Sequence, residues 1–225
     1  QHMNTIITIG REFGTGGHQI GVELAKELGI PCYDKELLEQ AAKESGLCKD
    51  IFESQDEKPT GSFLFSLVMD TYSTNRYSSN MFSDMPLNQK VFLAQFEAIK
   101  NIADKGSCVI IGRCADYALE FNKNLLSVFL HANIDTRIRR VSALYDITAA
   151  KAREKITKAD KSRASYYNYY TNKKWGSSEG YNLMVDTALY GINGTIDIIK
   201  KAIEVKEQSK IHNIYEEPMY SSISL

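Results

Sequence analysis

A glycine-rich turn between a predicted strand and a predicted helix constrains the fold more than any other feature of this chain. The strand is the β-branched run TIITIG (5–10), and the helix is HQIGVELAKELG (18–29), with its apolar residues spaced by four along one face. Five glycines fall within the twelve residues from 10 to 21. Glycines in such a turn allow positive φ values and let backbone N–H groups converge on an anion at the helix N-terminus. The turn therefore predicts a phosphate-binding loop.

This loop lacks the lysine that phosphate-binding loops usually carry. When the chain is aligned on GTG (14–16), Gly17 and His18 stand where the usual loop has its lysine and its magnesium-binding Ser or Thr. Positive charge must therefore come from elsewhere, and Arg11 and His18 are the nearest candidates. The residues expected to bind a nucleotide are Arg11, Gly14, Thr15, Gly16, Gly17, His18 and Gln19. The alternative is a purely structural strand-to-helix turn.

The rest of the chain alternates predicted strands with predicted helices. Apolar strands are expected at 107–113 and 125–132, and helices at 34–46 and 87–106. Strands separated by helices of this length predict a parallel sheet with right-handed crossovers, and hence an α/β layered fold.

Three segments depart from this alternation. Residues 54–86 mix Ser, Asn, Asp and Met with aromatic residues, which indicates an insert rather than a core element. Residues 135–175 carry a large share of the positive charge together with clustered tyrosines. The tail, 208–225, follows a predicted terminal helix and is expected to be loosely ordered or to pack on a partner.

Composition excludes several classes of partner. With 27 basic and 28 acidic residues the net charge is −1, so no overall field favours nucleic acid or an anionic membrane. No apolar run approaches the roughly 20 residues that span a bilayer. The four cysteines form no CxxC pair, which argues against a zinc site and against a disulfide scaffold. We therefore expect a cytoplasmic protein with a small-molecule substrate and no metal site formed by its own side chains.

The order of the motifs resembles one known family. GREFGTGGHQIG (10–21) followed by LAKELGIPCYDKELL (24–38) is similar to the cytidylate kinase-like group of P-loop kinases, whose members carry a lysine-free, doubled-glycine loop. The resemblance extends to about residue 205, and its further motifs are CVIIGRCADYAL (108–119), DTRIRRV (135–141), DKSRASYY (160–167) and YNLMVDTALYG (181–191). Five motifs in the right order are more specific than any one of them.

The resemblance implies a P-loop NTPase fold, a three-layer α/β/α arrangement with a parallel sheet. It implies a single kinase-like domain at 3–207, with a monophosphate-binding insert at about 47–90 and a helical lid at about 135–175. The C-terminal tail, 208–225, lies outside it. The implied reaction is phosphoryl transfer from ATP with Mg²⁺ to a nucleoside monophosphate, CMP or dCMP.

Such a reaction needs cationic groups that position two phosphates in line and neutralise the transferring charge. Arg137 and Arg140 are three residues apart on a predicted helix, so at least one is expected to face the cleft. Asp160 and Arg163 have the same spacing and are expected to pair, and their DxxR pattern matches the family's lid motif. We assign these four residues to catalysis. The alternative for each arginine is a solvated basic helix.

Arg113 is the best acceptor-site residue, because it follows an apolar strand at the end where parallel sheets bind ligands. Well-known cytidylate kinases have aspartates where this chain has Ile111 and Cys114, and Asp116 is the nearest acid here. We assign Asp116 to the acceptor site with Arg113. Asp34 either touches the substrate or caps the helix that follows it. The tyrosines of 166–170 either stack on a base or brace the lid against the body.

Three functions are compatible with these residues. The first is a nucleoside monophosphate kinase. The second is a P-loop kinase of another small molecule, motivated by the missing lysine and the altered GRCAD segment (112–116). The third is a nucleotide-binding regulator without catalysis. The number of subunits stays open, and a homo-oligomer is one option.

Overall fold

The computed structural model describes residues 3–38 and 87–211. Most of the predicted insert and most of the predicted tail lie outside these residues. The described elements are β1 (Ile6–Arg11), α1 (Gly17–Leu28), β2 (Cys32–Tyr33), α6 (Leu87–Ala103), β3 (Cys108–Ile111), α7 (Ala115–Ala118), β4 (Leu125–His131), α8 (Ile134–Tyr145), α9 (Ala149–Thr171), a 3₁₀ turn (Ser178–Gly180), β5 (Leu183–Asp186) and α10 (Thr187–Ile211). None of the described helices is long and apolar enough to cross a membrane.

The strands form one five-stranded sheet in the order β2-β3-β1-β4-β5, and every neighbouring pair is parallel. Strand β1 lies at the centre, where Ile6 is in register with Cys108 of β3 and with Leu125 of β4. Parallel neighbours bring the carboxyl ends of all strands to one edge of the sheet, where open α/β folds bind their ligands. The predicted parallel α/β fold is confirmed.

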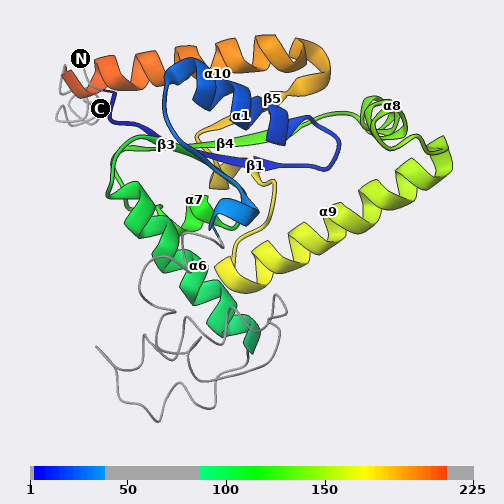
Figure 1. Ribbon diagram of the computed structural model, residues 1–225, viewed down its shortest axis with the longest axis horizontal. Helices are drawn as coiled ribbons and strands as arrows, with labels where there is room; N and C mark the ends of the chain where they lie inside the picture. The colour runs from blue at the N-terminus through cyan, green and yellow to red at the C-terminus, as the bar shows by residue number, and fades with distance from the viewer. Residues whose placement is uncertain (1–2, 39–86, 212–225) are drawn as a thin grey trace, which may run out of the picture.

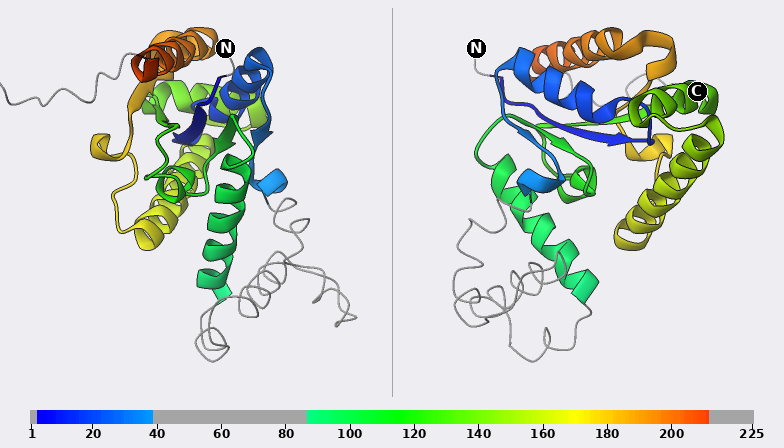
Figure 2. Two further views of the ribbon diagram at one scale, coloured as in Figure 1. Left: turned by 90° about the vertical axis from the view of Figure 1, so that its left-hand side faces the viewer. Right: turned by 45° about the vertical axis from the view of Figure 1, so that its right-hand side comes forward.

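Side chains alternate between the two faces of β1 and build two cores. Ile7 and Ile9 point into a cluster with residues of α1 and α10, whereas Ile6 belongs to a second cluster with residues of α6 and α7. Figures 1 and 2 show α1 and α10 on one face of the sheet and α6 and α7 on the other. Strands β1, β3 and β4 are largely buried on both faces, as their continuous apolar sequences predict, whereas β2 and β5 at the sheet edges are mostly half-buried.

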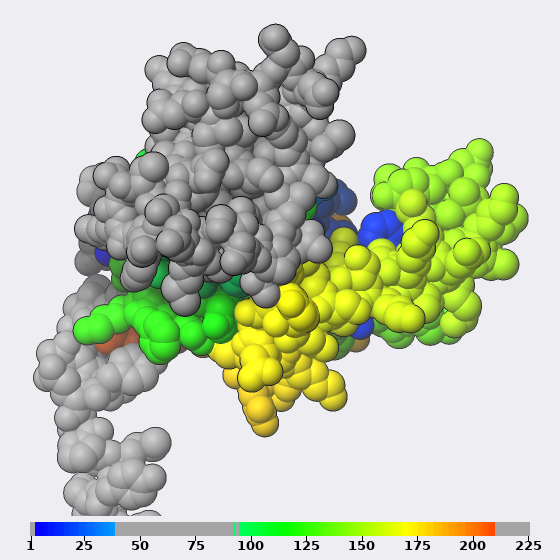
Figure 3. All heavy atoms as spheres, turned by 90° about the horizontal axis from the view of Figure 1, so that it is seen from below, coloured from blue at the N-terminus to red at the C-terminus, as the bar shows by residue number. Residues whose placement is uncertain are grey.

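Helices α8 and α9 form a hairpin at the carboxyl edge of the sheet (Figure 1). Asn133 and Thr148 cap their N-termini by accepting hydrogen bonds from the N–H groups of Thr136 at 2.9 Å and Lys151 at 3.3 Å. Seen from below, the yellow-green hairpin extends from one side of the molecule to its middle, where yellow residues of α9 meet green ones (Figure 3). The hairpin covers most of the segment predicted as a lid.

The last helix runs four residues into the segment predicted as the tail. Helix α10 continues to Ile211, so that residues 208–211 are helical, and 212–225 lie outside the described residues. A non-helical residue, Gly191 with φ 67° and ψ −174°, interrupts α10 near its start. This kink lets the chain leave the carboxyl edge of the sheet before the long part of the helix packs across it.

Candidate active site

The glycine loop joins β1 to α1 at the carboxyl edge. Gly14 and Gly16 have φ values of 86° and 82°, which are left-handed conformations that favour glycine. Gly16 is the N-cap of α1 and supplies no side-chain cap. The N–H groups of Gly17, His18 and Gln19 in the first helical turn have no intrahelical acceptor, and they lie at the positive end of the helix dipole. This geometry suits an anionic ligand.

The loop is held by a hydrogen bond within it and by a second one from helix α8. The buried Thr15 hydroxyl donates to the carbonyl of Glu12 at 2.9 Å, which closes the turn. Arg140 of α8 donates to the carbonyl of Thr15 at 3.2 Å and to the hydroxyl and carbonyl of Thr187 at 2.8 and 2.7 Å. Arg140 therefore ties the loop to the start of α10.

A mostly buried ion pair anchors the α8–α9 hairpin to the loop. Arg137 donates to Asp160 Oδ2 at 2.5 Å, and Asp160 Oδ1 accepts from the backbone N–H of Phe13 at 2.7 Å. Glu12 adds a second carboxylate, with its Oε2 3.5 Å from Arg137 Nε and 3.1 Å from the N–H of Ala132. The three charged side chains thus connect β1, β4, α8 and α9.

This arrangement corrects the predicted pairing of Asp160 with Arg163. The prediction assumed that a spacing of three on one helix decides the partner, whereas the approach of α8 brings Arg137 to Asp160. Arg163 instead donates from Nη1 to the carbonyl of Arg11 at 2.8 Å. Of the four residues assigned to catalysis, Arg163 is the one that lines the cavity described next.

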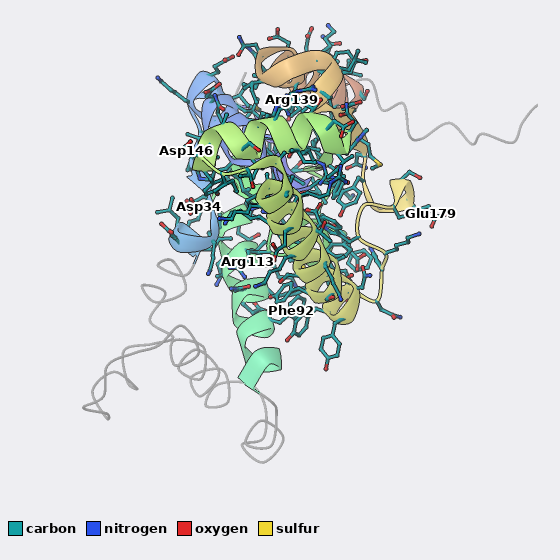
Figure 4. All side chains as sticks on the ribbon, turned by 90° about the vertical axis from the view of Figure 1, so that its right-hand side faces the viewer. Asp34, Phe92, Arg113, Arg139, Asp146 and Glu179 are labelled. Atoms are coloured by element: carbon teal, nitrogen blue, oxygen red, sulfur yellow. The ribbon has the colours of Figure 1, made fainter. Side chains whose placement is uncertain are left out.

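A cavity of about 330 Å³ opens beside the loop. Its walls come from the end of β1, the turn between β3 and α7, Lys35, the middle of α9, Trp175 and Tyr181. Figure 4 shows the labelled Arg113 between α6 and α9, on the same side of the molecule as Asp34. The cavity therefore lies where the carboxyl ends of β1 and β3 meet the α8–α9 hairpin.

Positive charge dominates the cavity wall. Four of the lining residues are cationic, namely Arg11, Lys35, Arg113 and Arg163. The pKa of Arg11 is lowered to about 9, mainly by burial and also by the nearby charges of Arg163 and Arg113, while the charge of Asp34 opposes them. Burial also lowers the pKa of Arg163, against the attraction of Asp160. Such crowding of like charges favours a bound anion, which would stabilise every one of them.

Asp116 is the one acid among the described lining residues, and it is engaged by a tyrosine. The hydroxyl of Tyr167 donates to Asp116 Oδ2 at 2.6 Å. Burial raises the pKa of Asp116, although the Tyr167 hydrogen bond opposes this. The aromatic rings of Tyr166, Tyr167, Trp175 and Tyr181 complete the wall. The cavity thus combines a cationic side with an aromatic side, which suits a flat organic group carrying a phosphate.

Comparison with known proteins agrees with this geometry. The profile of the cytidylate kinase-like family matches residues 6–189. The chain belongs to the cytidylate kinase-like family.

The family is one of phosphotransferases, and two proteins of similar sequence are named cytidylate kinase. A cytidylate kinase of Methanococcus vannielii is 25% identical over 203 residues, which cover 88% of this chain and 99% of that protein. A cytidylate kinase of Methanocaldococcus jannaschii is 28% identical over 105 residues, 46% of this chain and 59% of that protein. The predicted family is confirmed.

Solved structures support the fold. A crystal structure of an uncharacterized protein from Eubacterium ventriosum is 30% identical with a TM-score of 0.67, and the match covers 89% of this chain and 98% of that one. A gluconokinase from Sinorhizobium meliloti has a TM-score of 0.51 at 13% identity, over 97% of this chain and all of the other, and shows a shared fold alone. The P-loop kinase fold of this family member is confirmed.

The structure places Asp34 at a helix start. Its Oδ1 accepts from the N–H groups of Glu36 and Leu37, both at 3.1 Å, and its Oδ2 lies 3.2 Å from His18 Nε2. Burial alone would raise the pKa of Asp34, but these hydrogen bonds lower it overall. Of the two predicted roles for Asp34, the structure shows the capping role.

His18 stands in the position of the usual Ser or Thr and is 65% exposed beside Asp34. No group of three or more His, Cys, Asp or Glu side chains is arranged for a metal within residues 3–38 and 87–211.

The tyrosines of α9 brace the hairpin against α6. Tyr170 stacks on Phe92 with ring centroids 4.5 Å apart, and Tyr166 packs on Tyr170 at 4.7 Å. The hydroxyl of Tyr166 donates to Gln95 at 3.2 Å. Bracing is therefore observed, while Tyr166 and Tyr167 also line the cavity.

Sequence reasoning missed Glu12 and Gln95. Gln95 is a buried amide three residues after Phe92, on the apolar face of the predicted helix, and a polar residue there was the available signal. Glu12 lies inside the glycine loop motif, and no role was predicted for it from the sequence. Its partner Arg137 is 125 residues away in sequence, so no local pattern pointed to the pair.

Proposed function

We propose that this protein transfers a phosphoryl group from ATP to a nucleoside monophosphate, with CMP or dCMP as the acceptor. The observation that carries the proposal is the cationic cavity beside a phosphate-binding loop, at the carboxyl ends of β1 and β3. Family membership supports the reaction class, and the two relatives named cytidylate kinase support the acceptor. A cavity of about 330 Å³ lies at the small end of ligand pockets, as a monophosphate requires.

In this proposal the loop binds the donor and the cavity binds the acceptor. The N–H groups at the start of α1 bind the donor phosphates, because they lack acceptors of their own. Arg113 binds the acceptor phosphate from the β3–α7 turn, and Tyr166 and Tyr167 cover the organic part of the acceptor. Arg163 lies between the two sites, through its bond to the Arg11 carbonyl and its position in the cavity wall.

The bond changes follow from this placement. An acceptor phosphate oxygen attacks the γ-phosphorus of ATP, the bond from that phosphorus to the β,γ-bridging oxygen breaks, and ADP leaves with the electron pair. The products are ADP and a nucleoside diphosphate. The protein's contribution is to hold the two phosphates in line and to neutralise charge on the transferring group. Arg163 is placed for the second task.

The α8–α9 hairpin acts as the lid in this proposal, and the insert at about 47–90 contributes to the acceptor site. Lid closure excludes water, which would otherwise accept the phosphoryl group. Arg137, Asp160 and Arg140 hold the lid and loop together, so their contribution is to position the site.

The test is ADP release from ATP and magnesium with CMP, dCMP, UMP, AMP and GMP offered in parallel, and products identified by chromatography. We expect CDP or dCDP to form in preference to the others. A diphosphate formed from another acceptor would support the kinase activity and reject CMP and dCMP as its acceptors. Absence of any product from protein that binds ATP would reject the proposal and favour a kinase of another metabolite or a regulator.

A further inference from the structure

In the glycine loop, a glycine and a cationic residue have swapped positions relative to the P-loop consensus G-x-x-x-x-G-K-[ST]. With Gly16 as the second glycine of that pattern, the first glycine position holds Arg11 and the lysine position holds Gly17. A cation thus stands where the consensus has a glycine, and a glycine stands where the consensus has its cation.

The structure shows why these two positions depend on each other. The side chain of Arg11 runs across Gly17, where an added Cβ would lie 2.7 Å from Arg11 Cγ and 2.9 Å from Arg11 Cβ. Gly17 is the first residue of α1, in a helical conformation open to any residue. The requirement for glycine therefore comes from the Arg11 stem and not from the backbone. A lysine at position 17 would collide with Arg11 as it is placed.

A second glycine clears the path of the guanidinium. An added Cβ at Gly112 would lie 2.1 Å from Arg11 Nη1 and 3.2 Å from Arg11 Cζ. Arg11 therefore passes between Gly17 of the loop helix and Gly112 of the β3–α7 turn, and it reaches the wall of the cavity. The Arg11 guanidinium therefore lies where the loop and the cavity meet, although the residue itself stands at the end of β1.

The surroundings of Arg11 leave its charge available for a ligand. Its electrostatic neighbours Arg163 and Arg113 are cations. Within residues 3–38 and 87–211 the one attracting group is Asp34, which already binds His18 and two backbone N–H groups. His18, the other cation considered for the loop, is mostly exposed and turned toward Asp34. An arginine enclosed by other cations is stabilised when an anion binds among them.

We propose that Arg11 supplies the loop cation that lysine supplies in the P-loop consensus, and that Gly17 is a glycine because the Arg11 stem occupies the space of a lysine. Positions 11 and 17 then form a reciprocal pair in which one cation excludes the other. Arg11 contacts the terminal phosphates of the nucleotide and is a catalytic residue. The inference rests on the proposed function for the identity of that nucleotide.

Three variants test the exchange: Arg11→Gly, Gly17→Lys and the double variant, which restores the consensus glycine and lysine. Affinities for ATP, AMP and CMP are measured by calorimetry on the full chain, and transfer to CMP is measured alongside. Arg11→Gly should weaken ATP binding about 10- to 100-fold, as expected for the loss of a charge-assisted contact, and leave AMP and CMP binding within about 3-fold. Gly17→Lys should weaken ATP binding similarly, because it displaces Arg11.

The double variant decides the inference. We expect it to bind ATP at least about 10-fold more tightly than either single variant, because the lysine then has room. The proposal is wrong if the double variant binds ATP no better than the singles, if Arg11→Gly leaves ATP binding unchanged, or if it weakens CMP instead. Circular dichroism checks folding. If Arg11→Gly fails to fold, Arg11→Ala takes its place in both the single and the double variant.

These affinities separate the inference from the proposed function. Wild-type protein that binds ATP but phosphorylates no nucleotide would reject the proposed function, and the ATP affinities of the variants would still decide the role of Arg11. Conversely, CMP phosphorylation that survives Arg11→Gly with unchanged ATP affinity would reject the inference alone.

Discussion

Arg137 of α8 lies 2.5 Å from Asp160 of α9, and the same carboxylate accepts from the backbone of Phe13 in the glycine loop. One carboxylate therefore links both helices of the hairpin to the loop that is proposed to bind ATP. The side chains of Arg137 and Asp160 are only 10% and 18% exposed, so their attraction is weakly screened by solvent.

Replacing Asp160 by Asn should destabilise the protein, because it leaves the Arg137 charge buried without its closest partner. We expect a loss of about 3 kcal/mol in the free energy of unfolding. Urea unfolding monitored by circular dichroism measures it. The matched control is Asp135→Asn, which removes another aspartate–arginine pair between α8 and α9, one that is largely exposed, with Asp135 3.8 Å from Arg153. The control should change stability by less than about 1 kcal/mol, and equal effects would contradict the anchoring role.

Arg113 and Arg163 should affect different kinetic constants. Arg113→Ala removes a cation from the proposed acceptor site and should raise the KM for the acceptor about 10- to 100-fold. Arg163→Ala removes charge from between the two sites and should lower kcat about 100-fold or more. Steady-state kinetics with varied acceptor at saturating ATP separates the two constants.

Arg139→Ala is the control for both arginines. Arg139 lies on α8 on the exposed side and donates to Thr136 at 3.0 Å, away from the cavity. Its removal should leave kcat and KM within about 2-fold of the wild type. Unchanged kinetics in both Arg113→Ala and Arg163→Ala would remove the assignment of the cavity as the acceptor site.

Asp116 should make stability fall as the pH rises through the acid range. Burial raises the pKa of Asp116 in the folded state above its ordinary value of 3.8. The folded protein therefore binds this proton more tightly than the unfolded chain does, so the stabilisation is complete below pH 3.8 and is lost as the pH passes the raised pKa. Asp116→Asn should remove this part of the pH dependence.

Urea unfolding at a series of pH values compares wild type with Asp116→Asn. The stability of the variant relative to wild type should increase with pH across the window above 3.8. Tyr167→Phe is the companion variant. Because the Tyr167 hydroxyl lowers the pKa of Asp116 by donating to its carboxylate, its removal should raise that pKa further, which carboxyl ¹³C titration detects. Parallel pH profiles for wild type and Asp116→Asn would contradict the buried-acid assignment.

The stacked pair Phe92 and Tyr170 should couple α6 to the α9 end of the hairpin. The rings are 4.5 Å apart with an interplanar angle of 7°. A double-mutant cycle with Phe92→Ala and Tyr170→Ala should give a coupling energy of about 0.5–1.5 kcal/mol in the unfolding free energy. Pairing Phe92→Ala with Phe121→Ala is the control, because Phe121 is 93% exposed and should show no coupling. A coupling near zero for the stacked pair would mean that the brace contributes nothing.

Most of the fold could be predicted from the sequence. The run 5–10, the glycine stop at residue 29 and the spacing of apolar residues in 87–106 predicted β1, the end of α1 and α6, because each depends on contacts within a few residues. The alternation of these elements then predicted a parallel sheet, since short crossovers leave few alternatives. The position of Arg113 at the carboxyl end of its strand was predicted as well, and the strand order of the folded sheet places that strand next to β1.

The partners of the charged side chains were decided only by the tertiary structure. Local spacing paired Asp160 with Arg163, but the packing of α8 against α9 brought Arg137 closer. The route of Arg11 between Gly17 and Gly112 could not be predicted either, because the two glycines are 95 residues apart in sequence and only the fold brings both against the Arg11 side chain. Backbone periodicity depends on neighbours along the chain, so the sequence by itself determined the elements and their order. The partner of a buried charge depends on which elements pack together, so the ion pairs and hydrogen bonds of the site could be assigned only from the folded protein.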